Sequence, residues 1–164
     1  MWLYPLFALS LAGTAAVFRF LPAQIPIHWN FAGEVDRTGS RWWVFGLALI
    51  PLMIDLLMLA LPHIDPRKRN HKRHLRAYGM LRATLGIFLV SLLWISIAVS
   101  LGTPISESVV IPAMVGVLFM IIGNFLPQIK PNWFVGIRLP WTLSDPIVWK
   151  KTHRLGGWLF VLTG

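Results

Sequence analysis

Four long apolar runs, separated by short polar segments, dominate the chain. They cover residues 2–21, 42–62, 77–101 and 109–126, and a single charge, Arg19, interrupts the first. A helix needs about 20 apolar residues to cross the hydrocarbon core of a bilayer. The pattern therefore predicts an all-α integral membrane protein, a helical bundle with four complete transmembrane helices.

The N-terminal apolar run has the position of a secretory signal peptide. However, no positive side chain precedes it, and no small-x-small cleavage site follows it before Pro22. A signal peptide normally has both features. We therefore expect a retained transmembrane helix.

Residues 155–164 begin a fifth apolar run of only ten residues. This is too short to cross a bilayer, so we predict the start of a fifth helix and expect the natural chain to continue beyond it. Just before this run, Ser144 and Pro146 form a typical helix start, with a capping serine and a proline in the first turn. Gly156 and Gly157 would provide a hinge into the fifth helix.

The composition matters mainly for what it excludes. Only 13% of the residues are charged, about half the usual share in soluble domains, and 56% are hydrophobic. The absence of cysteine excludes disulfides, a thiol nucleophile and a thiolate metal site. We divide the chain into an N-terminal two-helix membrane unit, residues 1–78, and a second part, residues 79–164. The second part holds a helical hairpin and a polar segment, residues 127–157.

The charge of the loops predicts the orientation in the membrane. Residues 63–78 carry six Lys or Arg and one Asp, and residues 127–154 carry five and one, whereas the charges of residues 22–42 balance. The positive-inside rule then places the N-terminus and both basic segments in the cytoplasm, and residues 22–42 outside. This topology, together with attraction to anionic lipid, accounts for the net charge of +9 without nucleic acid.

The helix expected after Pro146 is amphipathic and should lie in the cytoplasmic interface of the bilayer. Ile147, Val148 and Leu155 would face lipid. Four polar side chains would face water or headgroups: Lys150, Lys151, His153 and Arg154.

Besides Arg19 near the end of the first span, two charged residues lie inside the predicted spans. Asp55 precedes Pro62 by seven residues, and Arg82 lies at a similar depth in the next span. Charged groups inside a membrane are costly and usually pair with one another. We predict an Asp55–Arg82 pair, either as a structural ion pair or as part of a proton or substrate relay.

The predicted outer loop, residues 22–42, carries His28, Asn30, Glu34 and Asp36. Its prolines and glycines disfavour helix and strand, so we expect an irregular loop with a tight turn at Gly33. A histidine with carboxylates can bind a divalent metal or act in acid–base chemistry. The weak metal candidates are therefore His28, Glu34 and Asp36, although their spacing fits no closed ligand set.

Two segments carry a resemblance to a known family. The run NFLPQIKPNWFVGIRLPWTLSDPIVWKKTHRLGG, residues 124–157, closely resembles the signature of the SdpI family, the bacterial immunity proteins against a sporulation-delaying toxin. The loop IPIHWNFAGEVDRTGSR, residues 25–41, resembles the small membrane domain of unknown function at the front of those proteins. Leu139 departs from the pattern, which has a threonine before the Pro-Trp pair.

The resemblance implies a multi-pass protein of the bacterial cytoplasmic membrane that confers resistance to a secreted peptide toxin. In the name-giving member it also implies binding of a small cytoplasmic repressor at the membrane. The candidate toxin- and partner-binding residues are His28, Asn30, Glu34, Asp36, Asn132, Trp133, Gly136, Arg138, Pro140, Trp141, Lys150, Lys151, His153 and Arg154.

Two other functions stay open from the residues alone. The Asp55–Arg82 pair would suit a small transporter or exporter subunit, and the His28, Glu34 and Asp36 group would suit a membrane enzyme. We rank both below a non-enzymatic immunity or signalling protein. We expect no catalytic residues and no cofactor.

Overall fold

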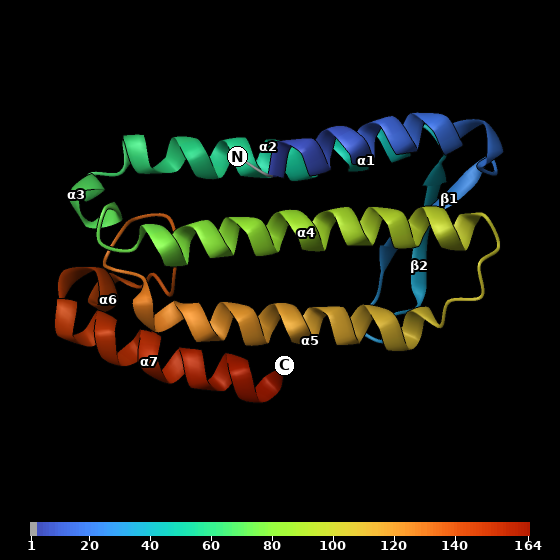
Figure 1. Ribbon diagram of the computed structural model, residues 1–164. Coiled ribbons are helices and arrows are strands. Elements are labelled where there is room, and N and C mark those ends of the chain that lie inside the picture. The colour runs from blue at the N-terminus through green and yellow to red at the C-terminus, as the bar shows by residue number, and fades with distance from the viewer. Residues whose placement is uncertain (1–2) are drawn as a thin grey trace. The chain divides into compact units, whose positions relative to one another are not determined.

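The computed structural model describes residues 3–164 (Figure 1). It confirms the predicted helical membrane architecture, with four helical segments long and apolar enough to span a bilayer. Trp2, where the first predicted span begins, lies outside the described residues. In chain order the elements are α1 Leu3–Val17, η1 Phe18–Phe20, β1 Gln24–Trp29, β2 Val35–Ser40, α2 Trp43–Ile64, α3 Lys68–His71, α4 Leu75–Ser100, α5 Glu107–Phe125, η2 Leu126–Gln128, α6 Pro140–Ser144 and α7 Pro146–Thr163.

The described residues form two compact units. The first combines residues 3–54 with residues 85–115, and the second combines residues 55–84 with residues 116–164. Helices α2, α4 and α5 each contribute one half to each unit. The division predicted between residues 78 and 79 cuts the chain at one point, whereas these two units are defined by spatial contacts. The structure therefore does not test that division.

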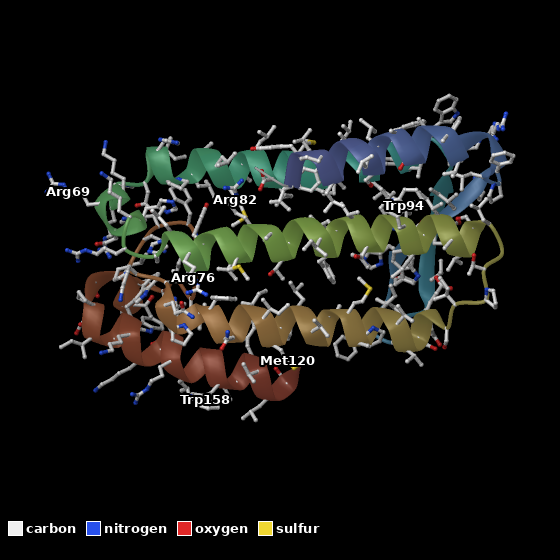
Figure 2. The ribbon with its side chains drawn as sticks, viewed as in Figure 1. Arg69, Arg76, Arg82, Trp94, Met120 and Trp158 are labelled. Atoms are coloured by element: carbon white, nitrogen blue, oxygen red, sulfur yellow. The ribbon has the colours of Figure 1, made fainter. Side chains whose placement is uncertain are left out.

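The first unit is built on an apolar core beneath the β1–β2 hairpin. Its buried members are Leu21, Ile25, Val44, Ala48, Leu93 and Ile97. They come from the residue after η1, from β1, and from α2 and α4, so burial of Ile25 ties the hairpin to the helices. Trp94 of α4 points toward α1, where its indole donates a hydrogen bond to Ser10 (Figure 2).

The second unit gathers α3, α6 and the start of α7 beside the N-terminal half of α4 (Figure 1). Its core contains Ala77 and Leu81 of α4 with Ile129 and Trp149. The Trp149 indole donates a hydrogen bond to the Ile129 carbonyl, which joins α7 to the segment that follows α5. Farther along, Gly123 and Gly157 allow α5 and α7 to approach closely, because a side chain at either position would meet backbone of the other helix.

Helix α2 continues past Pro62, where the sequence predicts its end. Proline has no N–H, so the Met58 carbonyl one turn earlier loses its helical partner. The Tyr78 hydroxyl of α4 donates a hydrogen bond to that carbonyl instead. This replacement satisfies the buried acceptor, and the helix runs to Ile64.

Three further local predictions differ from the structure. Residues 24–40 form an antiparallel hairpin rather than an irregular loop. Helix α7 is continuous through Gly156 and Gly157, so these glycines serve close packing and are not a hinge. The residue that caps α7 is Asp145 rather than Ser144, because its carboxylate accepts hydrogen bonds from two backbone N–H groups of the first turn.

Candidate functional site

The hairpin turn is organised by Asn30. Its side-chain carbonyl accepts hydrogen bonds from the N–H groups of Ala32 and Glu34 at 2.9 and 3.0 Å, and its amide donates to the Glu34 carboxylate. Gly33 adopts a positive φ of 76°, which favours glycine. The tight turn predicted at Gly33 is therefore present, and Asn30 organises it.

Two contacts anchor the hairpin to the helices of the first unit. The Trp29 indole donates a hydrogen bond to the Glu107 carboxylate at the start of α5, and the Ser96 hydroxyl of α4 donates to the Pro26 carbonyl. Gly33 lies so close to the Glu107 carbonyl that an added Cβ would be 2.7 Å from it. The hairpin is thus held against α4 and α5 and does not extend freely from the helices.

An apolar cavity of about 280 Å³ lies beside the hairpin within the first unit. Its three polar lining side chains, His28, Trp29 and Ser96, each already bond to another group of the protein. Such a lining suits an apolar group of a ligand better than a charged one. The cavity is lined by Ile27, His28, Trp29, Leu47, Ile50, Phe88, Leu89, Leu92, Leu93, Ser96, Ile111 and Val115.

The candidate metal residues do not converge. His28 Nδ1 lies 2.6 Å from Asp36 Oδ1, with both side chains substantially exposed, whereas Glu34 interacts with Asn30. Among residues 3–164, no three His, Asp or Glu side chains gather closely enough to hold a metal ion. The exposed His28–Asp36 pair therefore offers a polar contact at the surface of the hairpin.

Phe31 is the hairpin residue that the sequence interpretation missed. It occupies the turn and is fully exposed. A large apolar side chain placed at the tip of a polar turn gains nothing from the fold itself, which makes it a candidate contact residue. Its position as an aromatic residue between Asn30 and Ala32-Gly33 was the available signal.

In the second unit, Asp55 and Arg82 form the predicted ion pair. Arg82 Nη2 lies 2.8 Å from both carboxylate oxygens, and Arg82 Nε lies 3.0 Å from Oδ1. Arg82 extends from α4 toward α2 (Figure 2). The Asp55 side chain is only 1% exposed, so this bidentate contact supplies the counter-charge that a buried carboxylate requires.

The polar segment after α5, residues 129–139, is ordered by buried side chains that bond to backbone. Asn132 accepts hydrogen bonds from the N–H groups of Phe134 and Val135 and donates to the carbonyls of Lys130 and Val135. These four bonds use the full hydrogen-bonding capacity of the amide. Asn132, a predicted partner contact, therefore shapes this turn.

Gly136 and His153 lie directly against each other. His153 is fully buried and stacked on Trp149, with a ring-centroid distance of 4.0 Å. Its Nε2 accepts a hydrogen bond from the Ile137 N–H, and its Nδ1 lies 2.9 Å from the Trp149 carbonyl. Both ring nitrogens are thus used by the neutral imidazole, and burial lowers the pKa of His153.

The prediction that His153 faces water is wrong, since its ring has no exposed surface. Helical spacing explains this result: residues 149, 153, 156 and 157 follow the i, i+4, i+7 and i+8 pattern and form one buried face of α7. We call residues 127–157 the interfacial segment. The candidate residues that remain exposed in it are Trp133, Arg138, Pro140, Trp141, Lys150, Lys151 and Arg154.

The basic loop before α4 docks on this segment through further backbone contacts. Asp65 accepts a hydrogen bond from the Trp133 N–H, Arg67 donates to the Leu143 carbonyl, and Asn70 donates to the Pro131 carbonyl. His74 accepts a hydrogen bond from the Lys130 N–H, and burial, with His71 and Lys130 nearby, lowers the pKa of His74 to about 4. The two basic segments therefore form one folded surface.

Comparison with known proteins identifies the same two segments as the sequence resemblance. Residues 6–54 match a domain of unknown function (DUF1648), and residues 128–164 match the SdpI/YfhL protein family. The chain is 27% identical over 156 residues to the immunity protein SdpI of Bacillus subtilis (strain 168), covering 95% of this chain and 73% of that protein.

No solved structure matches the chain. The two family matches occur in one polypeptide, and the similarity to the SdpI protein extends into both of them within 156 aligned residues. The chain is therefore similar to the SdpI/YfhL protein family in its C-terminal segment and to an SdpI immunity protein along most of its length.

Proposed function

We propose that this protein is a bacterial membrane immunity protein that gives resistance to a secreted peptide toxin. The observation that carries the proposal is the relationship to the Bacillus subtilis immunity protein along 95% of the chain. The similarity covers 156 of the 164 residues, so it is not confined to one of the four candidate spans.

In this proposal the N-terminus and the basic segments face the cytoplasm and the hairpin faces outward, in accordance with the positive-inside rule. The toxin meets the hairpin first. The exposed Phe31 and the neighbouring apolar cavity offer contacts for apolar groups, and the His28–Asp36 pair offers polar ones.

The same proposal gives the interfacial segment a signalling role. Its exposed aromatic and cationic side chains, including Trp133, Trp141, Lys150 and Lys151, form a surface that suits a small cytoplasmic repressor. Aromatic residues with Arg and Lys supply large contact area together with charge complementarity.

Expression in toxin-sensitive cells tests the proposal. Cells that carry the gene should survive a toxin concentration that kills cells carrying an empty vector. A variant with His28→Ala and Asp36→Ala, produced at the same level in the membrane, should survive less well. Survival equal to the empty vector at confirmed membrane expression refutes the immunity function for toxins tested.

A further inference from the structure

We propose that a basic cavity in the second unit binds the phosphate group of an anionic lipid headgroup. The cavity measures about 400 Å³ and combines three cations with an amide and a hydroxyl. None of the described residues that line it is acidic. Its lining consists of Arg67, Asn70, Arg73, Lys130, Pro131, Ser144 and Pro146. The proposal does not depend on the immunity function.

The nearest acidic groups along the chain are already engaged. Asp65 accepts hydrogen bonds from the N–H groups of Arg67 and Trp133, and Asp145 caps α7. Within residues 3–164, ion pairs join only His28 to Asp36 and Arg82 to Asp55. The three cations of the cavity therefore keep their charge available for an anion.

The walls of the cavity are held in place before any ligand binds. Arg67 Nη2 donates a 2.6 Å hydrogen bond to the Leu143 carbonyl, and the Asn70 amide donates a 2.9 Å bond to the Pro131 carbonyl. These bonds join the basic loop to the segment that carries Lys130. Arg73 and Lys130 have exposed side chains that can reach a phosphate in the cavity.

The depth of the cavity favours a lipid headgroup over a ligand deep in the cytoplasm. Arg67 lies three residues after the span that ends at Ile64, Arg73 two residues before the span that begins at Leu75, and Lys130 two residues after the span that ends at Gln128. Since a residue spans at most about 3.5 Å of extended chain, each cation lies within roughly 10 Å of a span end. The headgroup layer is about 5–8 Å thick on each side.

Exposed apolar side chains stand next to the cavity in the chain. Ile64 and Leu75 end the spans on either side of the basic loop, and Ile147 follows Pro146 of the lining; they are 65%, 57% and 65% exposed. A free phosphate ion would use only the cations. A phospholipid would use both, with its phosphate in the cavity and its acyl chains against these side chains.

A pair of double variants with the same change in charge tests the proposal. Arg73→Gln/Lys130→Gln removes two cations from the cavity, whereas Lys68→Gln/Arg69→Gln removes two exposed cations of α3 that do not line it. Arg69 extends away from the fold (Figure 2). Native mass spectrometry of the full chain in detergent would measure binding of phosphatidylglycerol and of phosphatidylcholine with identical acyl chains.

The unaltered protein should bind phosphatidylglycerol more tightly than phosphatidylcholine. Each cation beside a bound anionic headgroup contributes roughly 1 kcal/mol, so loss of two cavity cations should weaken phosphatidylglycerol binding about 30-fold. The α3 variant should lose less than about threefold. Equal losses in both variants would show diffuse charge attraction, and equal binding of both lipids would show no headgroup selection; either result overturns the proposal.

Glycerol phosphate added as a competitor separates the two possible sources of phosphate. At concentrations equal to the lipid it should leave phosphatidylglycerol bound, because it lacks the acyl chains. Displacement at equal concentration would assign the cavity to a soluble phosphate compound and overturn the lipid assignment. Matching thermal unfolding curves for the two double variants would show that the difference does not come from misfolding.

Discussion

The hairpin and the interfacial segment use similar residue types in opposite ways. In the hairpin, His28, Asp36 and Phe31 are exposed, whereas the Asn30 side chain stabilises the turn through hydrogen bonds to backbone. In the segment, Asn132 and His153 are buried and bonded to backbone. A polar residue within a recognisable motif can therefore mark either a contact surface or the support of a fold, and burial distinguishes the two.

The largest effect should come from Gly136→Ala. Gly136 has a φ of +114°, and an added Cβ would lie 2.3 Å from His153 Nε2, which belongs to a buried ring that cannot move aside. Backbone strain and overpacking together should cost about 4 kcal/mol. Thermal unfolding in detergent would measure the loss. Gly79→Ala is the matched control, because nothing lies within 4 Å of the added Cβ in a helix, and it should be neutral or slightly stabilising.

Asn132→Ala should have the next largest effect. It removes the acceptor of the Phe134 and Val135 N–H groups and leaves a buried turn without its organising side chain. We expect a loss of about 2–3 kcal/mol in stability. The exposed Asn124 provides the comparison, since Asn124→Ala should change stability by less than about 0.5 kcal/mol. Similar values for the two variants would contradict the structural role of Asn132.

Acidification should weaken the second unit. His74 has a pKa of about 4 in the fold and about 6.5 when unfolded, so the unfolded chain binds the proton more readily between these values. The stability that depends on neutral His74 is complete above pH 6.5 and is lost as the pH falls toward 4. Between pH 7.5 and 5 the loss should approach about 2 kcal/mol. A His74→Gln variant should show a flatter decline of melting temperature with pH, and an unchanged slope would refute this assignment.

The smallest effect on stability should come from Phe31→Ser. Phe31 is fully exposed, so the variant should unfold within about 0.5 kcal/mol of the unaltered protein. If the hairpin is the surface that meets the toxin, survival of toxin-treated cells should fall nevertheless. Unchanged survival together with unchanged stability would remove Phe31 from the proposed contact surface.

The membrane spans and the Asp55–Arg82 pair could be predicted because both depend on local counting along helices. Apolar length sets the spans, and equal depth in two adjoining helices brings the charges together. The hairpin could not be predicted from the sequence, because its prolines and glycines disfavour a β-strand. Pro26 is tolerated because both strands of a two-stranded sheet are edge strands, and its carbonyl is held by Ser96, 70 residues away in the chain.

The burial of His153 was predictable in part. Its spacing from Lys150 and Arg154 indicates a polar face, but its spacing from Trp149 and Gly157 indicates a packed one. The turn at Gly136 places the Ile137 N–H beside the His153 ring, and this contact decides in favour of the packed face. Contacts of this kind depend on tertiary structure and have no periodic signal in the chain.

The Tyr78 hydroxyl of α4 donates a hydrogen bond to the Met58 carbonyl of α2, so the C-terminal end of α2 depends on packing against α4. Without α4 beside it, the Met58 carbonyl opposite Pro62 has no helical N–H to pair with, and a bilayer core offers no water in its place. The Met58 carbonyl gains its hydrogen bond when α4 packs against α2 and places the Tyr78 hydroxyl beside it. The last turns of α2 are thus a product of helix association, and a Tyr78→Phe variant would insert the same spans while leaving this junction loose.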